Sequence, residues 1–313
     1  MVYLNELHEG DTYSEIYYCK EKKVGTSKNG KTYYALTLQD QSACADGKIW
    51  DLTNAIEHFE SGDFIKIDFR VTTFNDKLQL NINRARKADE SEYAISDFMP
   101  TSPYNIDDMY ASLMKKIDSI ENVFLNKLLT SFFVDDKEVS EAFKVKSAAK
   151  GFHHAFVGGL LQHTLCVASI SDYLAKLYPS INRDLLVTAA ILHDIGKVKE
   201  LSDFPQNDYT DSGNLLGHIV MGSMMVKEKA DQIEGFPQGL KDELVHCILS
   251  HHGKLEFGSP EKPKIIEAIA LNFADDTDAK LEAFTEALKD NPEEEPWMPF
   301  SKMFDSVIRR TGN

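Results

Sequence analysis

Residues 185–197 read LLVTAAILHDIGK, an almost wholly apolar run that ends in His193, Asp194 and Lys197. A run that is apolar on every side predicts a buried helix rather than a surface helix. The imidazole and the neighbouring carboxylate are two metal ligands of different character. Lys197 follows Asp194 by three residues, so its ammonium group can lie on the same helical face. The stretch therefore predicts a buried helix whose end can hold a divalent cation and a phosphate together.

The buried His193–Asp194 pair needs a partner, because burying an unpaired charge is costly. A metal ion is one such partner. A hydrogen bond between the two side chains, or a cap at the helix end, would serve equally well. Asn182 and Asp184 are both candidates for the cap at the start of this helix. The pair alone leaves a metal site and a purely structural role equally open.

Histidines gather in the same part of the chain: eight of the ten lie between His153 and His252. His163 shares a helical face with apolar residues and is therefore expected to point inward. His218 follows the loop 213–217 at the entry to another helix. His251 and His252 end a helix expected over 241–252, and apolar neighbours at helical spacing do not choose between them.

Asp275 and Asp276 are expected to close an apolar helix over 265–273, and either could turn inward. Each of these elements is weak alone, but together they bring imidazoles and carboxylates to the ends or inner faces of successive helices. Such ligands suit Mn²⁺, Co²⁺, Fe²⁺ or Zn²⁺ rather than Ca²⁺. The candidate ligands are numerous enough for one ion or two.

The first part of the chain has the alternation of a β-sheet. Apolar residues occupy every second position over 65–71 and 78–82, which indicates strands with one buried face. Asn29-Gly30 predicts a tight hairpin turn, and Asn75-Asp76 a second turn. A short helix is expected over Thr53–Glu60. Five strands with one helix between the third and fourth predict a small barrel of the OB type.

Barrels of this kind hold single strands with aromatic and basic side chains. Some side chains in this part alternate away from the apolar positions and could face a groove; a solvated sheet face is the equally simple alternative. These candidates for nucleic-acid binding are Tyr33, Phe64, Lys66 and Arg70. Trp50 is expected in the core. We expect a barrel domain over residues 1–90, a linker with lead-in helices over 91–145, and a helical domain over 146–313.

The formal charge of −16 weakens a nucleic-acid role, since phosphates reward Lys and Arg. The charge is uneven, however: residues 1–90 carry a net −3 and the remainder −13. Four scattered cysteines argue against a disulfide scaffold and fit a reducing cytoplasm. No apolar run approaches the roughly 18 residues of a membrane span, and the N-terminus does not read as a secretory signal. We therefore expect a cytoplasmic protein with no membrane partner.

The order of the candidate ligands resembles that of the HD-domain metal-dependent phosphohydrolases. The stretches SAAKGFHHA (147–155), GGLLQHT (158–164) and YTDSGNLLGH (209–218), behind an OB-like segment, resemble more narrowly the YhaM-type 3′-5′ exoribonucleases. The resemblance covers nearly the whole chain. Gln162 departs from it, because Glu is expected before the histidine, so no catalytic role is assigned to Gln162.

The resemblance implies a multidomain protein, with an N-terminal five-stranded OB-like barrel followed by an all-α HD-domain bundle. It implies that Asp194 and Lys197 are catalytic and that Lys197 neutralises the scissile phosphate. The implied metal ligands are His163, His193, Asp194, His218, His251 and Asp275. His153, His154 and His252 are candidates for substrate contact, and His252 or Asp276 could replace His251 or Asp275. The implied cofactor is one or two divalent ions, Mn²⁺ first.

The implied activity is 3′-5′ hydrolysis of single-stranded RNA to nucleoside 5′-monophosphates, with single-stranded DNA as a second candidate substrate and a homo-oligomer as a candidate assembly. One alternative is an HD-type hydrolase of small nucleotides whose barrel is regulatory. Another is a nucleic-acid-binding protein with a degenerate site. The full run of ligand types argues against the last, and the barrel argues against a hydrolase of mononucleotides.

Overall fold

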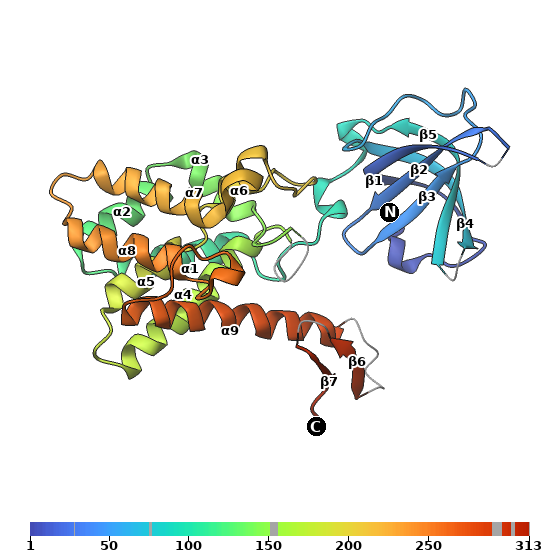
Figure 1. Ribbon diagram of the computed structural model, residues 1–313. Coiled ribbons are helices and arrows are strands. Elements are labelled where there is room, and N and C mark those ends of the chain that lie inside the picture. The colour runs from blue at the N-terminus through green and yellow to red at the C-terminus, as the bar shows by residue number, and fades with distance from the viewer. Residues whose placement is uncertain (28, 75–76, 151–155, 290–295, 302–303, 313) are drawn as a thin grey trace. The chain divides into compact units, whose positions relative to one another are not determined.

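The computed structural model describes residues 1–27, 29–74, 77–150, 156–289, 296–301 and 304–312. The chain divides into two compact units (Figure 1). The first comprises Met1–Pro103 and Ser202–Asp208, and the second comprises Tyr104–Leu201 and Tyr209–Asn313. None of the described helices is both long enough and apolar enough to cross a membrane.

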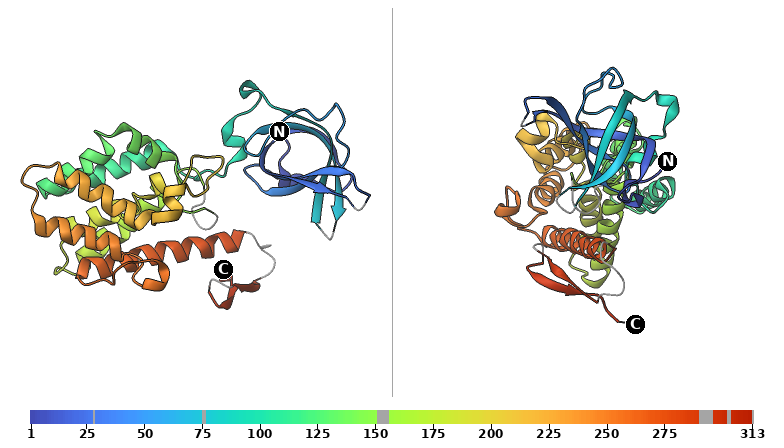
Figure 2. Two further views of the ribbon diagram at one scale, coloured as in Figure 1. Left: turned by 45° about the horizontal axis from the view of Figure 1, so that its top comes forward. Right: turned by 90° about the vertical axis from the view of Figure 1, so that its right-hand side faces the viewer.

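The first unit is a closed barrel with strands in the order β1-β2-β3-β5-β4, which the left view of Figure 2 shows as a ring. Its strands are β1 (Thr12–Thr26), β2 (Thr32–Gln39), β3 (Cys44–Ile49), β4 (Phe64–Phe74) and β5 (Lys77–Lys87), preceded by the short helix η1 (Leu4–Glu6). Neighbouring strands are antiparallel, except that β3 and β5 run parallel. The predicted five-stranded barrel is confirmed.

The alternation over 65–71 arises because every second side chain of β4 enters the barrel core. Ile65, Ile67 and Val71 are fully buried, whereas Arg70 is exposed. Gly30, in the turn between β1 and β2, has a φ of +77°, which glycine adopts without steric cost. The hairpin predicted from Asn29-Gly30 is confirmed. The turn predicted at Asn75-Asp76 lies outside the described residues.

Two predictions for residues 50–60 are wrong. The segment Thr53–Glu60 forms no helix; instead its backbone pairs with β5, with the Glu57 amide donating to the Ala85 carbonyl over 2.8 Å. Trp50 is not in the core but 46% exposed, because its indole donates to Asn81 (3.1 Å) at the barrel surface. Both errors arise because the surroundings of residues 50–60 depend on their contacts with β5. The local sequence pattern does not reveal these contacts.

Residues 88–103 have a polar, proline-containing sequence, yet part of the segment packs in the barrel unit. It contains η2 (Glu90–Glu92) and η3 (Ile95–Phe98). Phe98 is buried against Phe64, with ring centroids 4.9 Å apart. The segment thus adds a small apolar cluster to the outside of the barrel.

The second unit is a bundle of helices around one core. Its elements are α1 (Ile106–Asp118), α2 (Val123–Phe133), α3 (Lys137–Val145), α4 (Gly159–Leu177), α5 (Arg183–Leu192), α6 (Lys197–Glu200), α7 (Asp211–Asp231), α8 (Gln238–Ser250), η4 (Leu255–Phe257), α9 (Ile266–Lys289), β6 (Trp297–Ser301) and β7 (Ser306–Arg309). The antiparallel pair β6–β7 is held to α9 by Arg310, whose guanidinium donates to the Leu288 carbonyl (2.6 Å).

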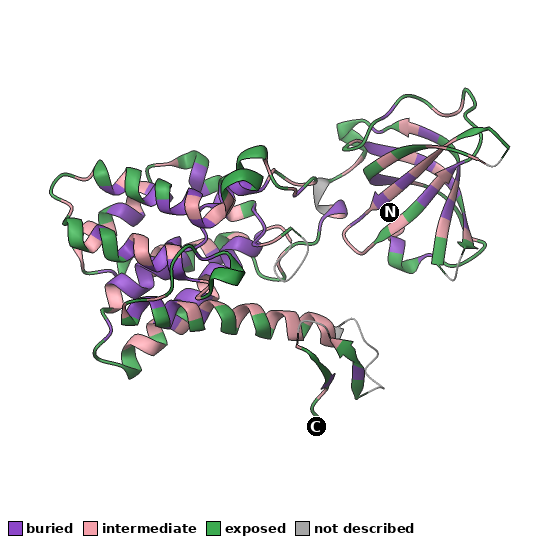
Figure 3. Ribbon diagram, in the orientation of Figure 1, coloured by how far each residue is buried: buried purple, intermediate pink, exposed green. Residues whose placement is uncertain are grey.

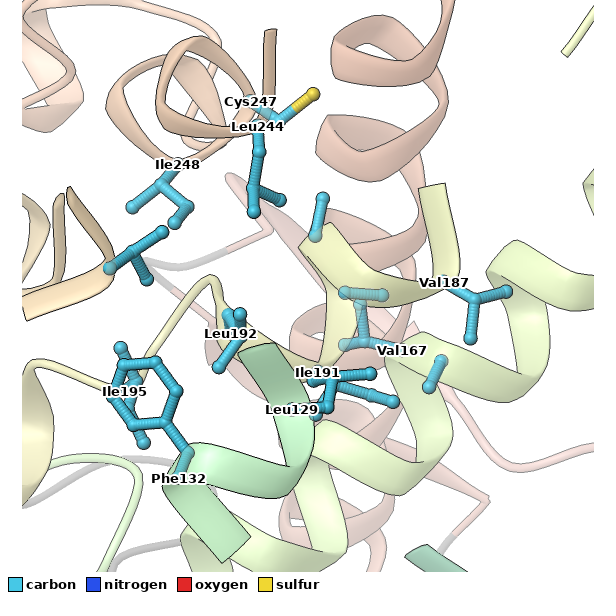
Figure 4. Close-up of a cluster of buried hydrophobic side chains, with 14 of the residues drawn as sticks. Leu129, Phe132, Val167, Val187, Ile191, Leu192, Ile195, Leu244, Cys247 and Ile248 are labelled. Carbon is cyan, nitrogen blue, oxygen red and sulfur yellow. The ribbon is translucent and has the colours of Figure 1, made fainter. Parts of the chain in front are cut away.

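Helix α5 runs through the centre of this bundle. All of its residues from Leu185 to Leu192 are buried, and Figure 3 shows this part in the colour of burial. Ile191 and Leu192 pack with side chains from α2, α4 and α8 (Figure 4). The Asn182 side chain caps the helix by accepting from the Leu185 amide (3.2 Å). The buried helix predicted from residues 185–192 is confirmed, with Asn182 rather than Asp184 as its cap.

Helix α8 (Gln238–Ser250) begins and ends earlier than the expected 241–252, and two further helices differ from their expected bounds. Helix α9 continues to Lys289, so Asp275 and Asp276 lie within it and do not close it. Helix α7 begins at Asp211, so most of the expected loop 213–217 is already helical, and a kink at Gly217 (φ +72°) separates it from His218. Asp275 and His218 therefore both lie within long helices, rather than at a helix end and after a loop.

Candidate metal centre

Asp194 stands at the centre of a cluster of imidazoles. Its Oδ2 atom lies 3.4 Å from His193 Nε2 and 3.6 Å from His163 Nε2. Its Oδ1 atom lies 3.3 Å from His218 Nε2 and 3.8 Å from His251 Nε2. The two oxygens of one carboxylate therefore face two different groups of histidines.

The first group consists of His163 on α4, His193 at the end of α5 and Asp275 on α9. Their ligand atoms lie within 4.8 Å of one another, and His163 Nε2 is 3.1 Å from Asp275 Oδ1. Asp276 takes no part, because its half-exposed carboxylate pairs with Lys280 (2.7 Å) at another part of the cavity lining. The geometry thus selects Asp275 over Asp276.

The second group consists of His218 on α7 and His251 and His252 after α8, again within 4.8 Å. His252 was expected to contact substrate or to replace His251. Both histidines in fact join the group, because Gly253 (φ +74°) ends the helix just beyond them and Asn272 donates to the His251 carbonyl (2.7 Å). His252 is therefore a further candidate ligand.

All the imidazoles in these two groups have an oxygen next to Nδ1. For His193, His251 and His252 it is a carbonyl, of Ala190 (2.8 Å), Ile248 (2.6 Å) and Phe257 (2.8 Å) respectively. A carbonyl only accepts, so Nδ1 must donate, and Nε2 of the neutral ring is left with its lone pair toward the cluster. Such contacts orient histidine ligands in metal sites.

For the other two imidazoles the oxygen belongs to a carboxylate that sequence reasoning missed. Asp278 Oδ2 lies 2.7 Å from His163 Nδ1, and Glu200 Oε1 lies 3.1 Å from His218 Nδ1. Asp278 follows Asp275 by three residues on α9, and Glu200 follows Lys197 by three on α6. An acid one helical turn from a candidate ligand or catalytic residue is the signal that could have revealed both.

Two glycines allow the helices to approach closely at His218. A Cβ at position 196 would lie 2.0 Å from the His218 backbone oxygen. Gly217, with its positive φ, turns the chain so that the His218 amide donates to Glu200 Oε1 (2.8 Å). The sequence Asp-Ile-Gly-Lys thus needs its glycine for the contact between α6 and α7.

Lys197 is bound to the same carboxylate. Its ammonium lies 2.8 Å from Asp194 Oδ2 and donates to the Ala148 carbonyl (2.5 Å). Burial would raise the pKa of Asp194, but Lys197 and His193 hold that pKa well below its usual range. Burial would likewise lower the pKa of Lys197, but Asp194 raises it. The pair is therefore ionised at neutral pH.

Within this cluster, three buried atoms lack a hydrogen-bond partner among the described residues, namely Asp194 Oδ1, His218 Nε2 and His251 Nε2. Although the first two are 3.3 Å apart, their geometry is not that of a hydrogen bond. Unpartnered buried polar atoms are costly, and here all three converge. Burial also lowers the pKa of His251 and of His252, which keeps both rings in the neutral form that binds a cation. The residues present therefore fit a metal ion.

A cavity of about 1110 Å³ opens onto this cluster, and Lys197, His163, Asp194, His252 and Asp275 line it. It is large enough for several nucleotide-sized groups, since ligand pockets are typically about 300–1,000 Å³. The group of candidate ligands around Asp194, called the metal cluster below, is therefore accessible from solvent.

The structure places the predicted nucleic-acid-binding residues less consistently. Phe64 is buried, with its ring stacked on Tyr93 at 4.2 Å, so its prediction as an exposed platform is wrong. Lys66 pairs with Glu92 (3.6 Å), and Arg70 is exposed. Tyr33 packs against Trp50, with ring centroids 4.9 Å apart. His153 and His154 lie outside the described residues.

Comparisons with known proteins identify the family of this chain. Residues 160–280 match the model of the HD domain. The chain is 37% identical over 288 residues to the 3′-5′ exoribonuclease YhaM of Bacillus velezensis and 36% identical to that of Bacillus subtilis, in each case covering 90% of both chains. The second OB-fold domain of replication protein A from Methanococcus maripaludis aligns with 28% of this chain and 95% of its own, at 16% identity and a TM-score of 0.24. The chain belongs to the YhaM family of HD-domain proteins.

Proposed function

We propose that this protein is a metal-dependent 3′-5′ exoribonuclease that hydrolyses single-stranded RNA and releases nucleoside 5′-monophosphates. The observation that carries the proposal is the Asp194 carboxylate, which stands between two groups of ligand atoms on the floor of an open cavity. The YhaM relatives are named for 3′-5′ exoribonuclease activity. An activity on single-stranded DNA is a second part of the proposal.

Two cations are proposed, with Mn²⁺ as the first choice. His163, His193 and Asp275 would hold one, His218, His251 and His252 the other, and Asp194 would bridge them through its two oxygens. Imidazoles and carboxylates together suit Mn²⁺, Co²⁺, Fe²⁺ and Zn²⁺. Bound cations of this kind screen the charge of a phosphodiester and make hydroxide available near neutral pH.

The protein's own residues hold this arrangement in place. Lys197 keeps Asp194 ionised and oriented, and it places a buried positive charge on the lining of the cavity. A fixed positive charge there stabilises the extra negative charge that a phosphodiester gains in the transition state. Asp278 and Glu200 orient His163 and His218 through Nδ1.

The barrel offers a surface for the RNA strand. Trp50 is exposed, its ring packs on Tyr33, and Lys48 Nζ lies 5.3 Å from the centre of the Tyr33 ring. Aromatic rings beside a cation bind single strands by stacking and by attraction to phosphate. Trp50 therefore replaces Phe64 in the proposed strand-binding surface, with Tyr33 and Lys48 beside it.

The cytoplasm is the proposed location. All four cysteines are free thiols. Free thiols persist in the reducing conditions of that compartment.

The test uses two labels on one RNA in the presence of Mn²⁺. With a 5′ label we expect a ladder that shortens one nucleotide at a time, and with a 3′ label a mononucleotide as the first product. Intact RNA beside rapid turnover of free nucleotides would instead favour a hydrolase of small nucleotides. The metal content of the purified protein is measured in parallel, and a stoichiometry of one ion per chain would contradict the two-cation arrangement.

A further inference from the structure

Two phenylalanines line the cavity above the metal cluster and remain largely exposed. Phe257 in η4 is 59% exposed and Phe273 in α9 is 63% exposed. Single exposed apolar side chains are ordinary on protein surfaces. Two aromatic rings on the lining of the cavity that also holds the candidate ligands are different, because they flank the place where a ligand must lie.

Both phenylalanines lie near candidate metal ligands. The Phe257 carbonyl lies 2.8 Å from His252 Nδ1 and so orients that imidazole. Phe273 and Asp275 both belong to α9 and both line the cavity. A molecule that places a phosphate at the cluster therefore brings its neighbouring groups within reach of these rings.

Two lysines accompany the rings, each paired with a carboxylate, Lys254 with Glu256 (3.3 Å) and Lys280 with Asp276 (2.7 Å). Lys254 and Lys280 also line the cavity, and Lys254 Nζ lies 5.1 Å from the centre of the Phe257 ring. The lining thus combines flat apolar faces, cations and a metal cluster. An aliphatic ligand would use only the first of these, whereas a nucleotide has a planar base and an anionic phosphate and would use all three.

We propose that Phe257 and Phe273 are stacking platforms for the bases of the 3′-terminal nucleotides of a strand whose phosphate lies at the metal cluster. The inference rests on the proposed exoribonuclease function and adds to it how the strand end is held. Every base has a π face, so stacking holds all four bases alike. The 3′-terminal base is then needed for binding, although its identity is not.

The first experiment needs no turnover. An oligoribonucleotide with 2-aminopurine at its 3′ end is titrated with the full-length protein in EDTA, and stacking is followed as fluorescence quenching. Phe257→Leu and Phe273→Leu keep an apolar side chain but remove the π face, and each should weaken binding about tenfold. Phe257→Trp and Phe273→Trp should retain the quenching. Tyr173→Leu is the matched control, because Tyr173 is 61% exposed on α4 and does not line the cavity.

The second experiment measures kcat/KM with Mn²⁺ on RNA that ends in a normal or an abasic nucleotide. The wild-type protein should prefer the normal end about tenfold, and the double variant Phe257→Leu, Phe273→Leu should show no preference. Bound metal is measured in each variant, so that damage to the metal cluster is recognised. If a Leu variant has lost metal, the corresponding Trp variant is used to judge the proposal. Equal preference in wild type and double variant, with unchanged quenching, overturns the proposal.

Failure of the exoribonuclease function has a different signature. In that case the wild-type protein leaves RNA intact with Mn²⁺, while the quenching still reports whether the rings stack on a strand end. A free nucleotide has the same chemistry as a strand end, so 2-aminopurine riboside 5′-monophosphate is titrated separately. Quenching of this mononucleotide but not of the oligonucleotide would overturn a strand-end site.

Discussion

The barrel and the helical bundle differ in where their candidate functional side chains lie. In the barrel they lie outside the core, and in the bundle they lie inside it. In the barrel the interior is apolar, and the candidate binding residues stand outside, where water can satisfy them; Lys66 and its partner Glu92 are both partly exposed. In the bundle the polar cluster is inside, where His193 and His251 are fully buried at the ends of apolar helices. Burial makes each polar residue depend on specific neighbours, and exposure does not.

This difference predicts that single substitutions have large effects in the bundle and small effects in the barrel. A buried ligand cannot be replaced by water without loss of the cluster, whereas an exposed aromatic ring is one of several weak contacts. Four changes, from the largest expected effect to the smallest, test this contrast.

The largest effect is expected for Asp275→Asn, which removes a carboxylate from the first ligand group. Turnover of RNA with Mn²⁺ should fall on the order of 10³-fold, because the charge that holds the cation is lost. Asp276→Asn is the matched control, since Asp276 lines the same cavity but pairs with Lys280 and belongs to neither ligand group. Steady-state kinetics on both variants decide between the adjacent acids, and an equal loss in both would remove the distinction between them.

A backbone contact is tested by Gly196→Ala. A methyl group there would lie 2.0 Å from the His218 oxygen, so the free energy of unfolding should fall by about 2 kcal/mol or more. Gly239→Ala, on α8, has no atom within 4 Å of its new Cβ and should be neutral or slightly stabilising. Urea unfolding followed by circular dichroism measures both. Similar stability of the two variants would mean that the contact between α6 and α7 is not tight.

The affinity for metal should depend on pH through His163. Burial alone would lower the pKa of His163, but hydrogen bonds with Asp275 and Asp278 raise it to about 9. Below that pH the ring carries a proton that competes with a cation for Nε2. Affinity for Mn²⁺ should therefore rise about tenfold per pH unit from this group between pH 6 and pH 9.

Asp278→Asn sharpens the same point, because it removes one of the groups that stabilise the protonated ring. The rise should then level off at a lower pH, and affinity at high pH should drop about 10- to 100-fold for want of the orienting carboxylate. Calorimetric titration with Mn²⁺ at several pH values follows both effects. An identical pH profile in the variant would show that Asp278 does not act on His163.

The smallest effect is expected in the barrel, for Trp50→Ala. Loss of one exposed stacking ring should weaken binding of a single-stranded oligonucleotide by about 1 kcal/mol and leave the thermal stability of the protein nearly unchanged. Fluorescence anisotropy with a labelled RNA measures the affinity. Phe74→Ala serves as the control, because Phe74 is also exposed on the barrel and stacks on no other ring among the described residues. A loss equal to that of Asp275→Asn would abolish the contrast between the two units.

Predictions from the sequence succeeded where side chains are buried on a regular element. The alternation over 65–71 and the apolar run over 185–192 revealed the barrel and the central helix, because burial imposes a period on the residues. They failed for positions that point away from the barrel core or lie in irregular segments. Phe64 has the alternation of an outward residue, but Tyr93 and Phe98 cover it, and nothing in the local pattern near residue 64 indicates that cover.

What the sequence determined by itself is the two-part architecture and the kinds of ligand that the bundle carries. Only the tertiary structure decided that Asp275 and not Asp276 faces the cluster, that His252 joins His251, and that Asp278 and Glu200 support the imidazoles. The physical reason is that periodicity reports which face of an element is buried. Which polar atoms meet within that face depends on how distant helices pack, and residues more than eighty positions apart converge on Asp194 only after folding.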